Sequence, residues 1–321
     1  MLNVESRKIF VVGKRSLAIT LPKKWVQQHG LGIGDVVELL MNSDGSITLR
    51  PIKKRTAPPR PSEGVVDAHS VPPEHLREAI TSFYINGYDS VKVVGTEGME
   101  GVMSDLTQSL VGTIVTETPE GYVLKFLISD DKVSVDEIMS RMGTVLKSML
   151  ELYIEYLWSG NTELLGRVLA LEEEVDRLYR LGMRILMSSL ARAYSEGAYS
   201  DIKKLVYRLI GLKIVEDLAD ALDRSVRAIM RLGNEDLGPE YRELFQEVTK
   251  LAIDSYAAFR DEDAQRGFKV LRRRVEIKAR VLQLKGRARE LLQILLSELE
   301  IMMTFSGDLA ELAIVLGAAS Q

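Results

Sequence analysis

The sequence predicts a multidomain α+β protein that is mainly α, with a small N-terminal β domain, a short α+β segment and two tandem antiparallel three-helix bundles. Three observations predict this fold class. Eight of the nine prolines lie at or before Pro119. The long tract that follows is rich in Leu, Arg, Glu and Ala, as helices are. Residues 53–63 are polar and proline-rich, which is typical of a tether between domains.

The first 55 residues, which we call the head, differ in charge from the rest of the chain. They hold ten Lys or Arg and four Asp or Glu, a net charge of +6. The remaining residues hold 32 basic and 42 acidic side chains, a net charge of −10. A basic head on an acidic body indicates that the two parts have different partners.

The head has the pattern of four short strands and one helix in the order β-β-α-β-β. The predicted strands cover residues 9–12, 17–21, 35–41 and 46–50. A helix is predicted over residues 23–29, because Pro22 suits a helix start. About 50 residues bury little core alone, so we expect the head to form a homodimer.

The head resembles the SpoVT/AbrB (MazE-like) swapped-hairpin domain over residues 3–52. The motifs that carry the resemblance are the basic strand KIFVVGKR, the segment ITLPKKW, the segment LGIGDVVEL and the final strand GSITLRP, in that order. The resemblance implies an intertwined homodimer that binds DNA through basic residues of its N-terminal strand and loop. The matching positions are Arg7, Lys8, Lys14, Arg15, Lys23 and Lys24.

The charge of the head agrees with DNA binding. Two-fold symmetry would double a cluster of Lys and Arg into a footprint for phosphates, and it predicts a roughly palindromic DNA site. Two alternatives stay open: the charges only solvate the surface, or the hairpins serve dimerisation or protein contacts, as in an antitoxin.

A small α+β segment, residues 64–133, follows the linker at residues 56–63. Helices are predicted over residues 73–86 and 98–110, and strands over 90–95, 113–118 and 121–129. The last two strands flank Pro119-Glu120, which predicts a hairpin. No motif in this segment specifies a chemistry.

The helical body divides at residues 233–239, which gives a bundle over residues 134–233 and a second over 234–321. The predicted helices cover residues 135–160, 161–194, 201–232, 240–260, 261–284 and 287–316. Two tandem three-helix units explain this order as a diverged repeat.

The first bundle carries two pairs of acidic residues at i, i+4, Glu172 with Asp176 and Glu216 with Asp220. Residue 196, inside the turn between the two helices, is the midpoint between the first pair and the second pair. The two pairs therefore lie at the same level of an antiparallel hairpin, and four carboxylates can converge. No basic residue matches the site positions, which makes the group costly without a cation. Oxygen ligands favour Fe, Mg, Mn or Ca. The alternative is a solvated acidic face.

Residues 135–318 resemble the PhoU family. The motifs are EEEVDRLYR with Glu172 and Asp176, Asp201-Ile202-Lys203, and VEDLAD with Glu216 and Asp220. The resemblance implies paired three-helix bundles whose acidic motifs bind iron or other divalent cations. It also implies a role in controlling phosphate uptake and its signalling, with a phosphate-transport or signalling protein as partner.

The second bundle departs from this pattern. Arg272 stands where the counterpart of Glu172 is expected, and Thr304 where that of Asp220 is expected. Glu276 and Glu300 remain, and we expect Arg272 and its basic neighbours to neutralise them in an ion-pair network without a metal.

Composition excludes several classes of function. The chain has no cysteine and three histidines, so thiolate sites, a histidine-rich metal site and the usual catalytic triads are excluded, and we expect no enzyme activity. No uninterrupted apolar run is long enough to span a bilayer, so we expect a cytoplasmic protein without membrane insertion. The leading hypothesis is a DNA-binding regulator of phosphate uptake. The alternatives are an antitoxin-like protein, a PhoU-type adaptor of a phosphate transporter that binds no DNA, and a carboxylate metal-binding protein.

Overall fold

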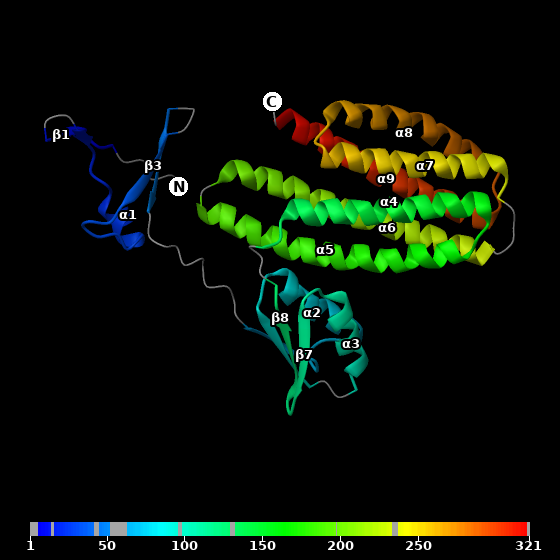
Figure 1. Ribbon diagram of the computed structural model, residues 1–321, viewed down its shortest axis with the longest axis horizontal. Coiled ribbons are helices and arrows are strands. Elements are labelled where there is room, and N and C mark those ends of the chain that lie inside the picture. Colours follow the sequence, from blue (N-terminus) through cyan, green and yellow to red (C-terminus); the bar gives the residue numbers. More distant parts are fainter. Residues whose placement is uncertain are drawn as a thin grey trace. The chain divides into compact units, whose positions relative to one another are not determined.

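The computed structural model divides the chain into two compact units, Met1–Pro59 and Arg60–Gln321 (Figure 1). The residues that it describes are 6–13, 16–41, 45–51, 63–95, 98–128, 132–196, 198–232 and 237–319. The linker predicted at residues 56–63 lies almost wholly outside these ranges.

The first unit consists of two separate hairpins and a short helix. Strand β1, Phe10–Val12, pairs with β2, Ser16–Ala18, and β3, Val37–Met41, pairs with β4, Ile47–Pro51, both antiparallel. Helix α1, Lys23–Gln28, connects them. The order is the predicted one. Strand β2 ends before the predicted residue 21, because the chain turns there into Pro22, the residue that precedes α1.

No described residue of the first unit is buried. Large apolar side chains are exposed along all four strands: Leu17 by 70%, Val11 by 66%, Leu39 by 63% and Ile47 by 61%. The hairpins do not pair with each other in one sheet. This unit therefore has no core of its own.

The second unit begins with a four-stranded sheet in the order β5-β6-β8-β7. Its strands are β5, Glu63–Asp67, β6, Ser90–Val94, β7, Thr113–Thr118, and β8, Gly121–Phe126; β5 and β6 are parallel and the other pairs antiparallel. Its helices are the 3-10 turn η1, Pro73–His75, and the α-helices α2, Leu76–Ile85, and α3, Glu100–Ser109.

Alternate residues of this sheet face a small core with α2 and α3. Val66, Val91, Val93 and Leu124 are buried together with Leu76, Ile80, Tyr84 and Leu106 of the helices. Strand β5 was not predicted. Its sequence, EGVVD, begins inside the apparent tether and offers few apolar positions. Gly64 is needed there, because an added Cβ would lie 2.3 Å from the Phe83 ring.

Six long helices form the rest of the unit, and their ends lie within about three residues of the predicted ones. They are α4, Val135–Ser159, α5, Glu163–Glu196, α6, Tyr199–Leu232, α7, Pro239–Arg260, α8, Ala264–Lys285, and α9, Glu290–Ala319. The sequence explains the boundaries of α4. Ser134 forms a capping box with Glu137, and Gly160 ends the helix at a positive φ of 70°.

The two three-helix bundles share one hydrophobic core with buried residues from all six helices. Helix α6 packs against α9, and α4 against α7 (Figure 1). Gly143 of α4 and Gly211 of α6 permit the close approach of α7, since a Cβ would meet the Tyr256 ring at Gly143 and the Phe259 ring at Gly211. The hydroxyls of Tyr153 and Ser225 form a buried hydrogen bond of 2.7 Å inside the first bundle.

Among the residues that the structure describes, one helix is long and apolar enough to cross a membrane by length and composition alone, residues Leu292–Ala318 of α9, with a mean hydropathy of 1.5. In the structure α9 packs against α6, α7 and α8. Its place in the bundle core therefore accounts for its apolar composition.

Candidate functional site

Three acidic side chains converge between α5 and α6. Glu172 and Asp176 from α5 and Asp220 from α6 each offer a carboxylate oxygen, and these oxygens lie within 4.8 Å of one another. All three residues are half-buried. Because α5 and α6 are antiparallel and joined by a short turn, residues equally distant from that turn face each other. We call these three residues the acidic cluster.

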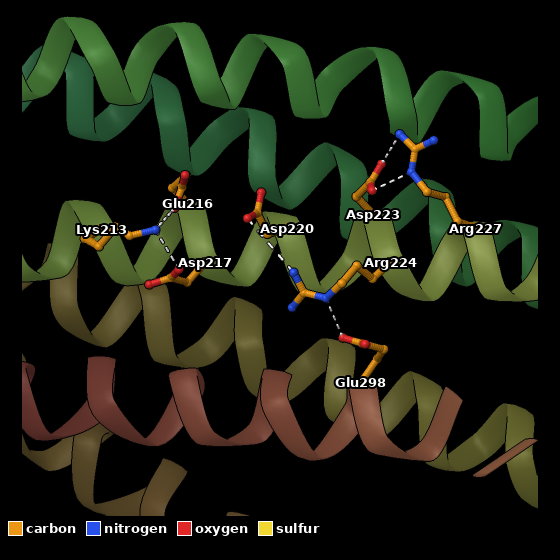
Figure 2. A network of polar contacts seen from close by, with 8 residues as sticks. All are labelled: Lys213, Glu216, Asp217, Asp220, Asp223, Arg224, Arg227 and Glu298. Atoms are coloured by element: carbon orange, nitrogen blue, oxygen red, sulfur yellow. Dashed lines mark hydrogen bonds and ion pairs between the residues drawn. The ribbon is translucent and has the colours of Figure 1, made fainter. Parts of the chain in front are cut away.

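Glu216, the fourth residue of the predicted site, does not belong to the acidic cluster. The ammonium group of Lys213 donates hydrogen bonds to Glu216 and, at 2.7 Å, to Asp217 (Figure 2). Burial raises the pKa of Glu216, and the hydrogen bond from Lys213 acts against this shift. Glu216 thus lies one helical turn from Asp220 but has a cation of its own.

The expectation that no basic residue matches the site positions is wrong. Arg180 pairs with Asp176, and Arg224 lies 4.0 Å from Asp220 while it donates to Glu298 of α9 at 3.0 Å. Figure 2 shows Arg224 reaching from α6 toward Glu298. Each arginine follows its aspartate by four residues, a spacing that brings side chains together on a helix. This spacing of Asp176 with Arg180 and of Asp220 with Arg224 is visible in the sequence and could have predicted both arginines beside the site.

Within the described part of the chain, Glu172 forms no ion pair of this kind, so its charge is the least compensated of the cluster. Burial, and next the charges of Asp176, Asp223 and Asp220, raise the pKa of Glu172 to about 7. Burial and the charge of Asp176 also raise the pKa of Asp220. Asp223 was not part of the predicted site, and its own carboxylate accepts from Arg227 at 2.7 Å.

The acidic cluster fits a hard cation. Oxygen ligands surround Ca²⁺ or Mg²⁺ at about 2.0–2.6 Å, so two ligands of one ion lie at most about 5 Å apart. The cluster meets this limit and offers only oxygen donors. A bound cation would offset the repulsion that raises the pKa of Glu172, and it would compete with Arg180 for Asp176.

In the second bundle the expected network of Arg272 with Glu276 and Glu300 is not formed. Glu300 pairs with Lys285 at 2.5 Å, and the Thr304 hydroxyl donates to the carbonyl of Glu300 on its own helix. The lysine at the end of α8 thus replaces Arg272 as the partner of Glu300. No second group of three convergent acidic side chains occurs in the described part of the chain.

The basic residues predicted to bind DNA lie at two places of the first unit. Arg7 and Lys8 precede β1, and Lys23 and Lys24 form the first turn of α1; all four are exposed. Lys14 and Arg15 lie outside the described residues.

Comparison with known proteins supports both resemblances. Residues 10–57 match the family model "Antidote-toxin recognition MazE, bacterial antitoxin", and residues 139–232 match that of the PhoU domain. The chain thus combines a segment similar to the MazE domain in the head with a segment similar to the PhoU domain in the first bundle. The PhoU match ends where α6 ends, so the departures of the second bundle lie beyond it.

The solved structures similar to the chain include two PhoU proteins. The crystal structure of PhoU from Pseudomonas aeruginosa has 20% sequence identity and a TM-score of 0.48, and covers 57% of this chain and 94% of its own. The crystal structure of the phosphate transport system regulatory protein PhoU from Streptococcus pneumoniae has 12% identity and a TM-score of 0.48, and covers 57% and 92%. No curated protein matches the chain.

Proposed function

We propose that the protein is a cytoplasmic, non-enzymatic regulator of phosphate uptake that binds DNA as a homodimer. The observation that carries the proposal is the union of a MazE-like head with a PhoU domain in one chain. The head supplies the DNA contact, and the PhoU domain senses phosphate status through a phosphate-transport or signalling protein.

Exposure of the head supports the homodimer. Its two hairpins leave apolar side chains open on every strand, and Met41 is exposed by 87%. Surfaces of this kind mark an interaction site, since a soluble monomer rarely leaves them uncovered. A second copy that contributes the same hairpins would cover them and build the missing core.

Charge supports DNA as the ligand of the head. Arg7, Lys8, Lys23 and Lys24 are exposed on a unit whose net charge is positive. In a dimer these charges occur twice, and each phosphate contact would release counterions.

The acidic cluster supports a bound Mg, Ca, Mn or Fe ion as part of the sensor. Glu172, Asp176 and Asp220 would be its ligands, and Glu216 would join them only after leaving Lys213. Such an ion would tie α5 to α6 and so set the spacing of the two helices.

Genome-wide recovery of DNA bound to the protein, at high and at low phosphate, tests the proposal. We expect enrichment upstream of phosphate-transport genes that changes with phosphate. A variant with Lys14→Ala and Arg15→Ala should lose the enrichment. The slope of its log K for DNA binding against log salt concentration should be smaller in magnitude by about one unit per lost phosphate contact per monomer. Enrichment that is absent, or unchanged in the variant, would contradict DNA binding by the head.

The MazE match favours a second candidate, an antitoxin-like protein whose head binds another protein. In that case a co-expressed toxin would co-purify with the protein and lose its activity, and no operator would be recovered. A PhoU-type adaptor that binds no DNA would show neither result and would co-purify with a transporter.

A further inference from the structure

Helix α8 is strongly basic within an acidic body. It carries eight Lys or Arg and a single acidic residue, Glu276. The basic residues are Arg266, Lys269, Arg272, Arg273, Arg274, Lys278, Arg280 and Lys285. Since α8 packs against α7 and α9 only through its inner face, its outer face is open to a partner (Figure 1).

An apolar row runs along the outer face of α8. Phe268 is exposed by 54%, Val275 by 71% and Leu282 by 54%. These residues are seven positions apart, so they lie almost in line over a length of about 21 Å. The inner face holds Val270, Ile277, Val281 and Leu284, which are buried. The three residues of the outer row are therefore not among the apolar residues that form the bundle core. We call it the α8 ridge.

Unpaired positive charge lies on the α7 side of the ridge. Lys269, Arg272, Arg273 and Arg280 line an open groove of about 450 Å³ with Glu276 and with Glu247 of α7. Arg280 pairs with Glu247 at 2.5 Å. Among the residues that the structure describes, Lys269, Arg272 and Arg273 form no ion pair. Three cations are thus available for a ligand.

The opposite side of the ridge is basic as well. At 100° per residue, the exposed Lys278 lies on the α9 side of the row, near Lys285, which is paired with Glu300 of α9. Arg272 and Lys269 lie on the α7 side. A single apolar row with positive charge on both sides is the pattern of a helix that lies on an anionic lipid surface.

We propose that α8 docks the protein on the surface of an anionic phospholipid membrane. Lys269, Arg272 and Arg273 hold lipid phosphates in the groove, and the α8 ridge enters the boundary between headgroups and acyl chains. The docking is peripheral, and it depends neither on DNA binding nor on a cation in the acidic cluster.

Two features favour a lipid surface over a protein helix or a second copy. A partner helix needs two adjacent apolar rows, but of the positions between the ridge residues Arg272 and Lys278 are charged, Ala279 is small, and Leu271 is partly buried against the bundle core. A second copy would bring two basic helices together, and like charges repel. A flat, negatively charged surface matches a single convex row with basic flanks.

Co-sedimentation of the full chain with vesicles tests the proposal. We expect binding to vesicles of phosphatidylcholine with about 30% phosphatidylglycerol, weaker binding at higher salt, and none to pure phosphatidylcholine. Lys269→Gln with Arg272→Gln and Arg273→Gln should weaken binding about a hundredfold, at about fivefold per charge. Phe268→Ser with Val275→Ser and Leu282→Ser should weaken it about tenfold or more.

Matched controls separate α8 from other surfaces. Met230→Ser with Arg167→Gln changes an exposed apolar and an exposed basic residue outside α8, and it should leave vesicle binding unchanged. Far-ultraviolet circular dichroism verifies that each variant is folded.

Several results would overturn the proposal. If both α8 variants bind anionic vesicles as tightly as the wild type does, the lipid contact lies outside α8. Titration heat with inorganic phosphate in the absence of vesicle binding would make the groove a site for free anions only. A change of oligomeric state in the ridge variant, again without vesicle binding, would mean that a second copy covers the ridge.

Discussion

Glu172 connects a single side chain to the stability of the first bundle. Its pKa in the folded protein, about 7, lies above the usual value of 4.5 because of burial and the charges of Asp176, Asp223 and Asp220. The protonated form is therefore favoured by folding. The contribution of this pKa shift to the free energy of unfolding is fully present below pH 4.5 and is lost as the pH rises to about 7. After a discount for solvent screening this amounts to about 1–2 kcal/mol.

We predict that Glu172→Gln reduces this loss of stability in protein freed of metal by chelator, because glutamine has no proton to lose. Urea unfolding at pH 5 and pH 7.5 measures the difference for each variant. Glu155→Gln, a change at an exposed residue of α4 that does not contribute to this shift, is the control and should keep the wild-type difference. Equal pH dependence in all three proteins would contradict the charge conflict at Glu172.

The same three residues predict an effect of cations. We expect chelator to lower the midpoint of thermal unfolding of the wild type, because a ligand at a hundred times its Kd stabilises the folded state by about 2.7 kcal/mol. Asp176→Asn with Asp220→Asn should abolish this shift, because two of the three ligands lose their charge. Asp217→Asn, which removes only a partner of Lys213, should retain it.

Elemental analysis accompanies that experiment. Wild-type protein without metal and without a chelator effect would mean that Glu172, Asp176 and Asp220 share protons instead of a cation. If a cation does bind, its apparent affinity should rise with pH up to about 7, since Glu172 must release its proton first.

Among the elements, α5 joins the acidic cluster to the α+β segment. Asp176, Arg180 and Arg184 follow one another at intervals of four on this helix. Arg184 is completely buried, and its Nη1 donates to the carbonyls of Tyr84 and Tyr88 at 2.9 Å. Its guanidinium group also lies 5.3 Å from the centre of the Tyr84 ring. One arginine thereby fixes the end of α2 to the first bundle.

We predict that Arg184→Ala destabilises the protein by about 3 kcal/mol, because it removes the hydrogen bonds of a buried guanidinium group to the carbonyls of Tyr84 and Tyr88 and opens a cavity. Arg184→Lys should recover only part of this loss, since an ammonium group lacks the planar fork that reaches both carbonyls. Arg177→Ala on the exposed side of α5 should change stability by less than about 0.5 kcal/mol. Urea unfolding of the three variants checks this. Equal stability of Arg184→Ala and Arg177→Ala would show that the buried contact does not join the two parts.

The elements also show what the sequence could predict. Helix ends and the level of Glu172 with Asp220 follow from local signals, the caps and the turn of an antiparallel hairpin. The role of Arg184 does not, because its partners are main-chain carbonyls about a hundred residues away, and an arginine in a helix is usually exposed. Strand β5 could not be predicted for a related reason: it is stabilised by pairing with its parallel neighbour β6, and its own sequence has no clear strand pattern.

At the scale of the whole molecule, the chain keeps its two positive surfaces on different parts, the head and α8, while the acidic cluster lies in the first bundle. If both proposals hold, DNA and anionic vesicles occupy separate surfaces. The alternation of apolar and polar residues in the sequence predicted which side chains are buried in the second unit. It did not do so in the head, whose strands have the alternating pattern but bury no described residue in a single copy. A sequence pattern shows which faces are apolar, but not which chain covers them.

The head therefore carries the last prediction. We expect the full chain, and the isolated head, residues 1–55, to be dimers at micromolar concentration, because one copy of the head exposes Leu17 by 70% and Leu39 by 63% and has no buried residue in its described part. Leu17→Asp with Leu39→Asp in the full chain should yield a monomer that no longer binds DNA, since a charge in the shared core costs several kcal/mol. Val65→Asp, at a residue of the second unit that is 62% exposed, is the control and should leave the dimer intact. Analytical ultracentrifugation distinguishes the states, and a folded, monomeric wild-type head at this concentration would refute the shared core.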